Sequence, residues 1–402
     1  MTDLEKFIYE KVVKRDSSMF LDDLLQNKER LVEKIANKTV LVIGGAGSIG
    51  SSFIKAILSF RPGALVVVDI NENALTELTR DIRSTHELYI PKDYITYPMD
   101  YASKVFEKMF RAHKGFDIVA NFSAHKHVRS EKDIYSIEAL LQNNLLHAKF
   151  LLDLLAEFPP EEYFCVSTDK ATNPVNIMGA SKRVMEDLIF SYSDIFPVIT
   201  ARFANVAFSN GSLLAGFLAR MEKLQPLSAP MDVKRYFVSP EESGQICMLA
   251  CMLGKNREIF YPKLEESQMM TFDAIATELL HYNGYELLEC DSDEEAKEKA
   301  KELQNGSRLY PVYYSVSNTS GEKEFEEFVT DVEVTDTTRF SSLGVIVRKK
   351  IPNKDRLEIL LNRMESVFEK ESITKEEIVN IMKEYLPSFQ HIETGKSLDS
   401  KM

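Results

Sequence analysis

The feature that most constrains the fold of this chain is a glycine-rich turn between an apolar strand and a helix. Residues 38–45 (KTVLVIGG) are largely apolar and β-branched without alternation, which is typical of a strand buried on both faces of a parallel sheet. Glycine occupies the first, fourth and seventh positions of Gly44–Gly50 (GGAGSIG), and the helical pattern SIGSSFIKAILSF follows. Because glycine lets the backbone turn tightly, this pattern predicts a strand–turn–helix unit of an α/β sheet.

The alternation of strands and helices continues along the first half of the chain. Further strands are expected at ALVVVDI, YITYPMD, FDIVANFSA and EYFCVSTD, with helical patterns between them. This order predicts a Rossmann-type, doubly wound parallel sheet. We expect an N-terminal helical appendage at 1–37 and the Rossmann domain at 38–205. A smaller lobe is expected at 206–345, interleaved with the last elements of the sheet, and a helical C-terminal region at 346–402.

Composition and charge exclude several classes of protein. The 402 residues include 49 Lys and Arg against 62 Asp and Glu, a net charge of −13, so a general nucleic-acid binder is not expected. The amino terminus is charged throughout, and no stretch approaches the roughly 20 apolar residues that span a bilayer. The four cysteines form no Cys-x-x-Cys pair, and His125 and His127 have no visible third ligand. We therefore expect a cytoplasmic protein without membrane insertion or a metal site.

The glycine turn and the next two strand ends have the pattern of a dinucleotide site. The amino terminus of a helix presents free N–H groups and a positive dipole to a pyrophosphate. Asp69 ends the second strand, 19 residues after Gly50, where a carboxylate accepts hydrogen bonds from the adenosine ribose and repels a 2′-phosphate. The pattern favours NAD over NADP, and the alternatives are a turn without a ligand and a capping aspartate. The predicted cofactor contacts are Gly44, Gly47, Ser48, Ile49, Gly50 and Asp69, with Asp100 near the adenine amino group.

A second group of motifs lies at and beyond the end of the strand EYFCVSTD. The motifs are STDKA from Ser167, NPVN from Asn173, MGASKR from Met178, KHV from Lys126, RFANV from Arg202 and RYF from Arg235. Together with the glycine turn, they resemble the extended short-chain dehydrogenases/reductases. More narrowly, they resemble the nucleotide-sugar 4,6-dehydratases of polysaccharide biosynthesis that act on UDP-N-acetylglucosamine. The resemblance covers residues 38–260.

This resemblance implies a reaction without net redox change. Carbon 4 of the sugar is oxidised by hydride transfer to NAD, water is lost across carbons 5 and 6, and the hydride returns to carbon 6. Such a site needs an acid and a base beside the nicotinamide. The resemblance assigns Asp169 as the acid, Lys170 as the base and Lys182 to the nicotinamide ribose. A lysine base needs a lowered pKa, which burial favours and a neighbouring carboxylate opposes, and the residues alone leave this balance open.

Position 178 departs from the usual pattern of the superfamily. Most members have tyrosine four residues before the active-site lysine, whereas this chain has Met178, whose thioether cannot usefully accept the carbon-4 hydroxyl proton. A subset of the 4,6-dehydratases shares this methionine, and the resemblance then implies that Thr168 relays the proton. An NAD-dependent 4-epimerase is the first alternative, but it would require the tyrosine and has no use for Asp169 and Lys170. A non-catalytic NAD-binding sensor or scaffold is the second.

The resemblance also implies contacts with the remaining parts of the cofactor and substrate. Ala124 is assigned to the cofactor wall, and Asn143 is expected to brace the active-site strands. Arg235 is expected to pair with a phosphate, with an interdomain salt bridge as the alternative. We expect a homo-oligomeric, NAD-dependent UDP-N-acetylglucosamine 4,6-dehydratase that forms a UDP-4-keto-6-deoxy amino sugar. The predicted substrate-binding residues are Lys126, Asn173, Asn205, Arg235 and Glu258, the last of them at the uridine ribose.

Overall fold

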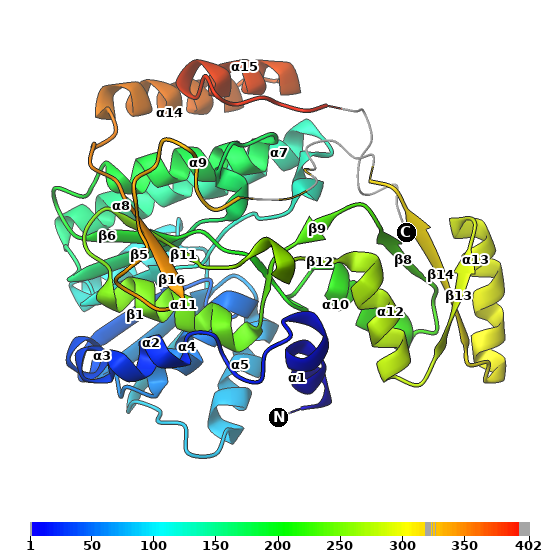
Figure 1. Cartoon of the computed structure of the whole chain (residues 1–402). Coiled ribbons are helices and arrows are strands. Elements are labelled where there is room, and N and C mark those ends of the chain that lie inside the picture. Colours follow the sequence, from blue (N-terminus) through cyan, green and yellow to red (C-terminus); the bar gives the residue numbers. More distant parts are fainter. Residues whose placement is uncertain (1, 318–322, 324, 326, 394–402) are drawn as a thin grey trace.

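The computed structural model describes residues 2–317, 323, 325 and 327–393, and its largest element is a single mostly parallel sheet (Figure 1). Nine strands of the described residues form this sheet in the order β15-β16-β11-β6-β5-β4-β1-β2-β3. The strands from β11 to β3 run parallel, whereas β16 is antiparallel to β11 and β15 is antiparallel to β16. The strand order reverses at β1, and the prediction of a doubly wound α/β sheet is confirmed. The strands are β1 (Thr39–Ile43), β2 (Ala64–Asp69), β3 (Asp93–Pro98), β4 (Ile118–Asn121), β5 (Glu162–Val166), β6 (Val198–Ala201), β11 (Glu258–Pro262), β15 (Thr335–Asp336) and β16 (Leu343–Val347).

Helices cover both faces of this sheet because its central strands are apolar on both sides. In β1, Val40 and Val42 belong to one hydrophobic cluster, whereas Leu41 and Ile43 belong to the other. The first cluster includes side chains of α3 (Lys28–Ile35), α4 (Ser48–Leu58), α5 (Glu72–Ser84) and α11 (Pro240–Leu253). The second includes side chains of α6 (Lys104–His113), α7 (Ile134–Leu141), α8 (Ala148–Glu157), α9 (Ile177–Phe190), α14 (Lys354–Phe368) and α15 (Lys375–Tyr385).

Helix α9 has very little free surface. It lies beneath the hairpin of α14 and α15 at the top of Figure 1, and 13 of its 14 residues are buried. Leu360 and Met364 of α14 and Met382 of α15 are buried in the same cluster as the apolar side chains of α9. The position of α9 is therefore determined by packing on both of its sides.

A smaller lobe lies beside the carboxyl edge of the large sheet. Its three parallel strands have the order β13-β14-β8 and comprise Glu286–Cys290, Leu309–Ser315 and Leu227–Pro230. The helices α10 (Leu213–Glu222) and α12 (Phe272–Tyr282) contribute to its core, as does the 3₁₀ segment Ala300–Asn305, which follows α13 (Asp293–Lys299). The first helix, α1 (Asp3–Phe7), buries Phe7 in this lobe, whereas Phe20 and Leu31 belong to the core of the large sheet. The N-terminal segment thus contacts both bodies.

The segment predicted as the smaller lobe, 206–345, is shared between the two bodies. Helix α11 and the strands β11 and β15 from this segment belong to the large sheet or pack on it. The predicted boundary after residue 345 falls inside β16. Two helices occupy the predicted C-terminal region, of which residues 394–402 lie outside the described residues. Within the described part of the chain, no helix combines the length and apolarity needed to cross a bilayer.

Candidate active site

The glycine turn connects β1 to α4 and passes close to the end of β4. Gly44 has a φ of +70°, and a Cβ atom there would lie 2.7 Å from the backbone nitrogen of Ser123. At Gly50, a Cβ atom would lie 2.4 Å from the carbonyl oxygen of Gly44. Gly47 is the N-cap residue of α4, so the first N–H groups of this helix, including those of Ser48 and Ile49, have no intrahelical acceptor. The turn is a compact anion cradle that fits the pyrophosphate of a dinucleotide.

The predicted ribose and adenine contacts lie at the ends of β2 and β3. Asp69 Oδ2 accepts a hydrogen bond from the backbone N–H of Ala46 at 3.0 Å, which holds the carboxylate against the glycine turn. Asp100 follows β3 and is exposed, with its Oδ1 accepting a hydrogen bond from Ala102 N at 2.8 Å. Ala124 follows β4 and is half-buried. These predicted cofactor contacts follow neighbouring parallel strands and therefore lie along one edge of the sheet.

The predicted acid–base pair follows β5 at the same edge. Asp169 begins a 3₁₀ turn (Asp169–Ala171), and its backbone N–H donates to the carbonyl oxygen of Phe203, which follows β6, at 3.2 Å. Lys170 Nζ lies 3.1 Å from Asp169 Oδ1, and the Thr168 hydroxyl donates to the same oxygen at 2.8 Å. The Asp169 side chain is 3% exposed and that of Lys170 is 19% exposed. One carboxylate oxygen thus contacts both of the other candidate catalytic groups.

Helix α9 carries the remaining predicted catalytic positions, Met178 and Lys182. The Asn176 side chain caps the helix by accepting from Gly179 N at 2.7 Å. Lys182 is 3% exposed, and its Nζ donates to the carbonyl oxygen of Val166 at 3.1 Å. Burial lowers the pKa of the Lys182 ammonium. At Gly179, a Cβ atom would lie 2.4 Å from the carbonyl oxygen of Lys170, so this glycine allows α9 to approach the turn of Asp169 and Lys170 closely.

A comparison with known families agrees with this arrangement of motifs. Residues 40–347 match the model of a family described as polysaccharide biosynthesis protein. The chain belongs to this polysaccharide biosynthesis family. The match spans the glycine turn, the acid–base pair and both bodies of the fold, and the resemblance predicted from the motifs is confirmed.

Individual proteins and solved structures are similar to this chain at low identity. An uncharacterised membrane protein of Methanocaldococcus jannaschii is 28% identical over 87% of this chain and 96% of its own length. An inverting UDP-N-acetylglucosamine 4,6-dehydratase of Campylobacter jejuni is 26% identical over 61% of this chain and 72% of its own length. Matches to two other bacterial polysaccharide-biosynthesis proteins span 45% and 46% of those longer chains. The structure of Pen from Bacillus thuringiensis shares the fold, with a TM-score of 0.63, 20% identity, and coverage of 88% of this chain and 98% of that one.

In this family member, two bracing residues were not predicted from the sequence. Asn144, which is 1% exposed, accepts from His125 N and donates to His125 O, both at 3.0 Å, and donates to Ser181 Oγ at 3.1 Å. The predicted brace, Asn143, accepts from Ser123 Oγ at 3.4 Å, so most of the bracing contacts belong to its neighbour. Both asparagines lie in a π-helical segment (Gln142–His147), a local distortion that often occurs at functional sites. The two adjacent asparagines, Asn143 and Asn144, were the sequence signal that could have indicated this brace.

Glu131 is the second unpredicted residue and it acts at the start of α9. Its Oε1 accepts from Met178 N at 2.9 Å, while its Oε2 lies 3.6 Å from Nε2 of His391 in the C-terminal segment. The next residue of that segment, Ile392, donates its N–H to the carbonyl oxygen of Val175 at 2.9 Å. These contacts connect three distant parts of the chain, and no local sequence pattern indicates them.

The predicted substrate-binding residues are only partly brought together. Asn205 begins β7 (Asn205–Val206), which pairs with β10 (Phe237–Val238), so the segment of Arg235 lies beside it. Among the described residues, Asn205 Nδ2 is buried and has no hydrogen-bond partner. Asn173 follows the catalytic turn and is exposed, with a φ of +47°, and Lys126 is also exposed. Arg235 is 5% exposed and donates to the carbonyl oxygen of Lys234 at 2.8 Å.

Glu258 does not lie with these residues. It begins β11, at the opposite edge of the parallel sheet from the strand ends that carry the site. Its side chain is 5% exposed and accepts hydrogen bonds from Arg339 at 3.0 and 2.5 Å and from Lys255 N at 2.7 Å. This buried ion pair uses the carboxylate oxygens within the protein. The structure therefore contradicts the prediction that Glu258 contacts the uridine ribose.

Proposed function

We propose that this chain is an NAD-dependent nucleotide-sugar 4,6-dehydratase and that its substrate is UDP-N-acetylglucosamine. The observation that carries the proposal is the group of Thr168, Asp169 and Lys170 at the end of β5, beside a helix with Met178 in the usual position of tyrosine. A dehydratase needs an acid and a base that act on neighbouring carbons. The Campylobacter jejuni relative named as such an enzyme supports this reaction class.

The residues of the glycine turn and β2 would hold the cofactor. Gly44–Gly50 and the amino terminus of α4 would bind the pyrophosphate, and Asp69 would accept hydrogen bonds from the adenosine ribose. A carboxylate at this position disfavours a 2′-phosphate, which supports NAD rather than NADP. When bound, NAD supplies a hydride acceptor for carbon 4 and a hydride donor for carbon 6. Lys182 would position the nicotinamide ribose from behind the end of β5.

The hydrogen bond from Thr168 to Asp169 supports a specific path for the proton of the carbon-4 hydroxyl. As carbon 4 is oxidised, this proton passes to Thr168 Oγ1, which passes its own proton to Asp169 Oδ1 at 2.8 Å. Asp169 then holds the proton that the carbon-6 hydroxyl needs in order to leave as water. The proton from carbon 4 is thus balanced by the proton that departs with the leaving water.

Lys170 becomes the base through the same event. Its Nζ lies 3.1 Å from Asp169 Oδ1, the oxygen that receives the proton from Thr168. Once Asp169 holds this proton, Lys170 Nζ gives a proton to solvent and accepts the proton of carbon 5. With the hydride that bound NAD would supply to carbon 6, Lys170 would return a proton to carbon 5 and regain one from solvent, which restores the starting site after the loss of one molecule of water.

Incubation of the purified protein with NAD and UDP-N-acetylglucosamine in deuterated water tests the proposal. The expected product has lost one water and carries deuterium at carbon 5. A carbon-4 epimer without loss of water would instead identify an epimerase, the alternative in the same class. Unchanged substrate together with tight NAD binding would identify a non-catalytic sensor or scaffold, and either result would contradict the dehydratase.

A further inference from the structure

A chain of buried charges lies directly behind the candidate active site. Glu186 occupies α9 one helical turn after Lys182 and is completely buried. Its Oε1 accepts from the Ser167 hydroxyl at 2.7 Å and from Arg202 Nε at 2.9 Å, and its Oε2 accepts from Arg202 Nη2 at 2.8 Å. Ser167 directly precedes Thr168, and Arg202 follows β6. A single carboxylate therefore joins the ends of β5 and β6 to the helix that carries Lys182.

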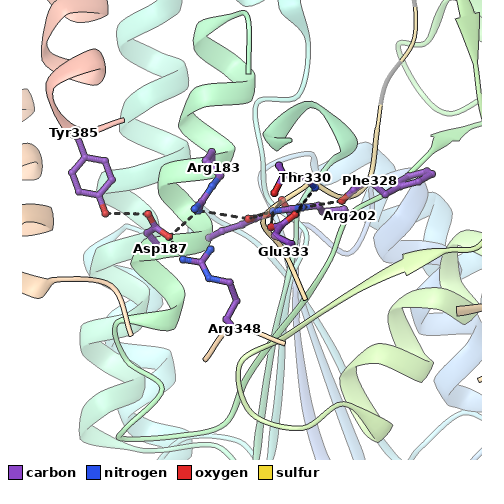
Figure 2. Close-up of polar contacts among 10 residues, drawn as sticks. Arg183, Asp187, Arg202, Phe328, Thr330, Glu333, Arg348 and Tyr385 are labelled. Atoms are coloured by element: carbon purple, nitrogen blue, oxygen red, sulfur yellow. Dashed lines mark hydrogen bonds and ion pairs between the residues drawn. The ribbon is translucent and has the colours of Figure 1, made fainter. Parts of the chain in front are cut away.

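Glu333 supplies the outer end of this chain of charges (Figure 2). Its Oε1 accepts from Arg202 Nη2 and its Oε2 accepts from Arg202 Nη1, each at 2.8 Å. Arg202 Nη1 also donates to the carbonyl oxygen of Phe328 at 2.8 Å, and Thr330 N donates to Glu333 Oε2 at 2.8 Å. The side chain of Glu333 is 12% exposed, whereas those of Arg202 and Glu186 are inaccessible. Glu186, Arg202 and Glu333 thus form a contiguous sequence of alternating charge, and Lys182 lies one helical turn before Glu186 on α9.

Stability alone is a weak reason for this arrangement, because burying charges is costly even when they are paired. Among the described residues, the hydrogen-bond partners of the Lys182 ammonium are uncharged: the carbonyl oxygen of Val166 and the sulfur of Met185. Two titratable groups oppose this environment by raising the pKa of the Lys182 ammonium: the Cys165 thiol of β5 and the Glu186 carboxylate of the same helix. Burial alone would raise the pKa of Glu186, but Arg202 lowers it to about 2, so Glu186 is ionised in the folded protein.

We propose that Glu186 is a positioning residue for the proposed dehydratase reaction, because it provides the counter-charge of Lys182 and fixes Ser167 at the start of the Thr168–Asp169–Lys170 turn. Arg202 and Glu333 hold Glu186 in this place. Both glutamates use their carboxylate oxygens on groups of the protein, so they act through Lys182 and Ser167 rather than on the substrate. Because this inference rests on the proposed function, its test includes a measurement that needs no substrate.

The test compares Glu186→Gln and Glu333→Gln with a matched control, Asp187→Asn. Asp187 is the next residue of α9 and also pairs with arginines, at 2.8 Å from Arg183 Nη1 and 2.6 Å from Arg348 Nη2 (Figure 2). It also accepts from the Tyr385 hydroxyl, on the side of the C-terminal hairpin. All three changes remove one charge and keep the shape of the side chain, but only the two glutamates pair with Arg202. Arg183 is shared, since its Nη1 lies 3.8 Å from Glu186 Oε2 as well as 2.8 Å from Asp187 Oδ1.

The first measurement is the pH dependence of kcat and KM between about pH 6 and pH 10. Without its counter-charge, the Lys182 ammonium loses its proton at lower pH. We expect the alkaline limb of kcat to move down by about one pH unit in Glu186→Gln, and by a smaller amount in Glu333→Gln, with KM changing less than about threefold. We expect the profile of Asp187→Asn to keep its midpoint.

The second measurement is the melting temperature of the protein without substrate over the same pH range. The pKa of Lys182 is lowered in the folded protein, so in the pH window between its folded and unfolded values the unfolded chain binds more protons and stability rises with pH. In the glutamate variants the folded-state pKa of Lys182 is lower still, so the rise in stability begins at lower pH. The Tm of these variants therefore lies furthest below that of the wild type at low pH, and the difference shrinks as pH rises. The loss in Asp187→Asn stays constant because its arginine partners remain charged.

These outcomes separate the two proposals. If the wild type does not dehydrate UDP-N-acetylglucosamine, the proposed function fails, but the melting experiment still tests the counter-charge. If Glu186→Gln does not fold, Glu333→Gln carries the test, because Glu333 is the less buried of the two glutamates and its replacement leaves Glu186 in place. A pH dependence of Tm that is the same in Glu333→Gln and Asp187→Asn would overturn the inference.

Discussion

Replacement of Gly179 by alanine tests how closely α9 must approach the catalytic turn. The added Cβ atom would lie 2.4 Å from the carbonyl oxygen of Lys170, whereas ordinary contacts begin at 3.4 Å. The atom in the way is a backbone oxygen, which cannot rotate aside as the end of a side chain can. Either α9 or the turn of Asp169 and Lys170 must therefore move by about 1 Å. A displacement of about 1 Å in a catalytic group can cost about 100-fold in rate, which corresponds to about 2.7 kcal/mol of transition-state stabilisation.

The assay is kcat for loss of water from UDP-N-acetylglucosamine, with NADH binding and Tm measured on the same protein. We expect kcat to fall about 100-fold in Gly179→Ala. The change in Tm should be small, because alanine gains about 1 kcal/mol of helix propensity over glycine and offsets part of the strain.

The matched control is Gly216→Ala in α10, where the Cβ atom would lie 2.7 Å from Nη1 of Arg220, the mobile end of a long side chain. This substitution should leave kcat within about twofold, since the guanidinium group can move aside. A Gly179→Ala protein that retains kcat within about threefold of the wild type would refute the requirement for close approach.

Three further predictions follow from the site and its charges. Lys170→Ala should lower kcat by about 10³-fold while NADH affinity, measured by fluorescence, stays within about twofold, and substantial residual turnover would exclude Lys170 as the base. Gly44→Ala should abolish NADH binding in a titration of the folded protein, because φ is +70° and a Cβ atom would lie 2.7 Å from Ser123 N. The pKa of Glu186 is lowered from 4.5 to about 2, so its ionisation should contribute about 3 kcal/mol of stability above pH 4.5 that is lost as pH falls towards 2. In urea unfolding, the stability difference between wild type and Glu186→Gln should therefore shrink on acidification, and a constant difference would contradict this assignment.

Sequence patterns within short segments were enough to predict the architecture and the place of the proposed acid–base pair in it. The unbroken apolar strand before Gly44 and the helix after Gly50 predicted a parallel sheet with a tight turn, because burial on both faces and close backbone approach leave a local signature. Asp169 and Lys170 are adjacent in sequence and follow a buried strand, so their place at the carboxyl edge of the sheet could be inferred without a structure.

The position of a residue along its strand was harder to predict. Glu258 was expected at the uridine ribose, but it begins β11 and pairs with Arg339, which lies 81 residues later in the chain. A strand of 5 residues has a carboxyl end in the site and an amino end far from it, and the prediction had selected the wrong end. Similarly, the π-helical segment turns Asn144 rather than Asn143 towards His125, a rotation that helical periodicity does not reveal.

The sequence by itself determined the elements, their order and the chemistry available at the strand ends, since these depend on residues within a few positions of one another. Only the tertiary structure decided what lies behind those strand ends. Arg202 meets Glu333 across 131 residues of sequence, and Glu131 meets Met178 across 47. Such contacts depend on which distant segments the packed core brings together, and buried charges are tolerated only where that packing supplies a partner of opposite sign.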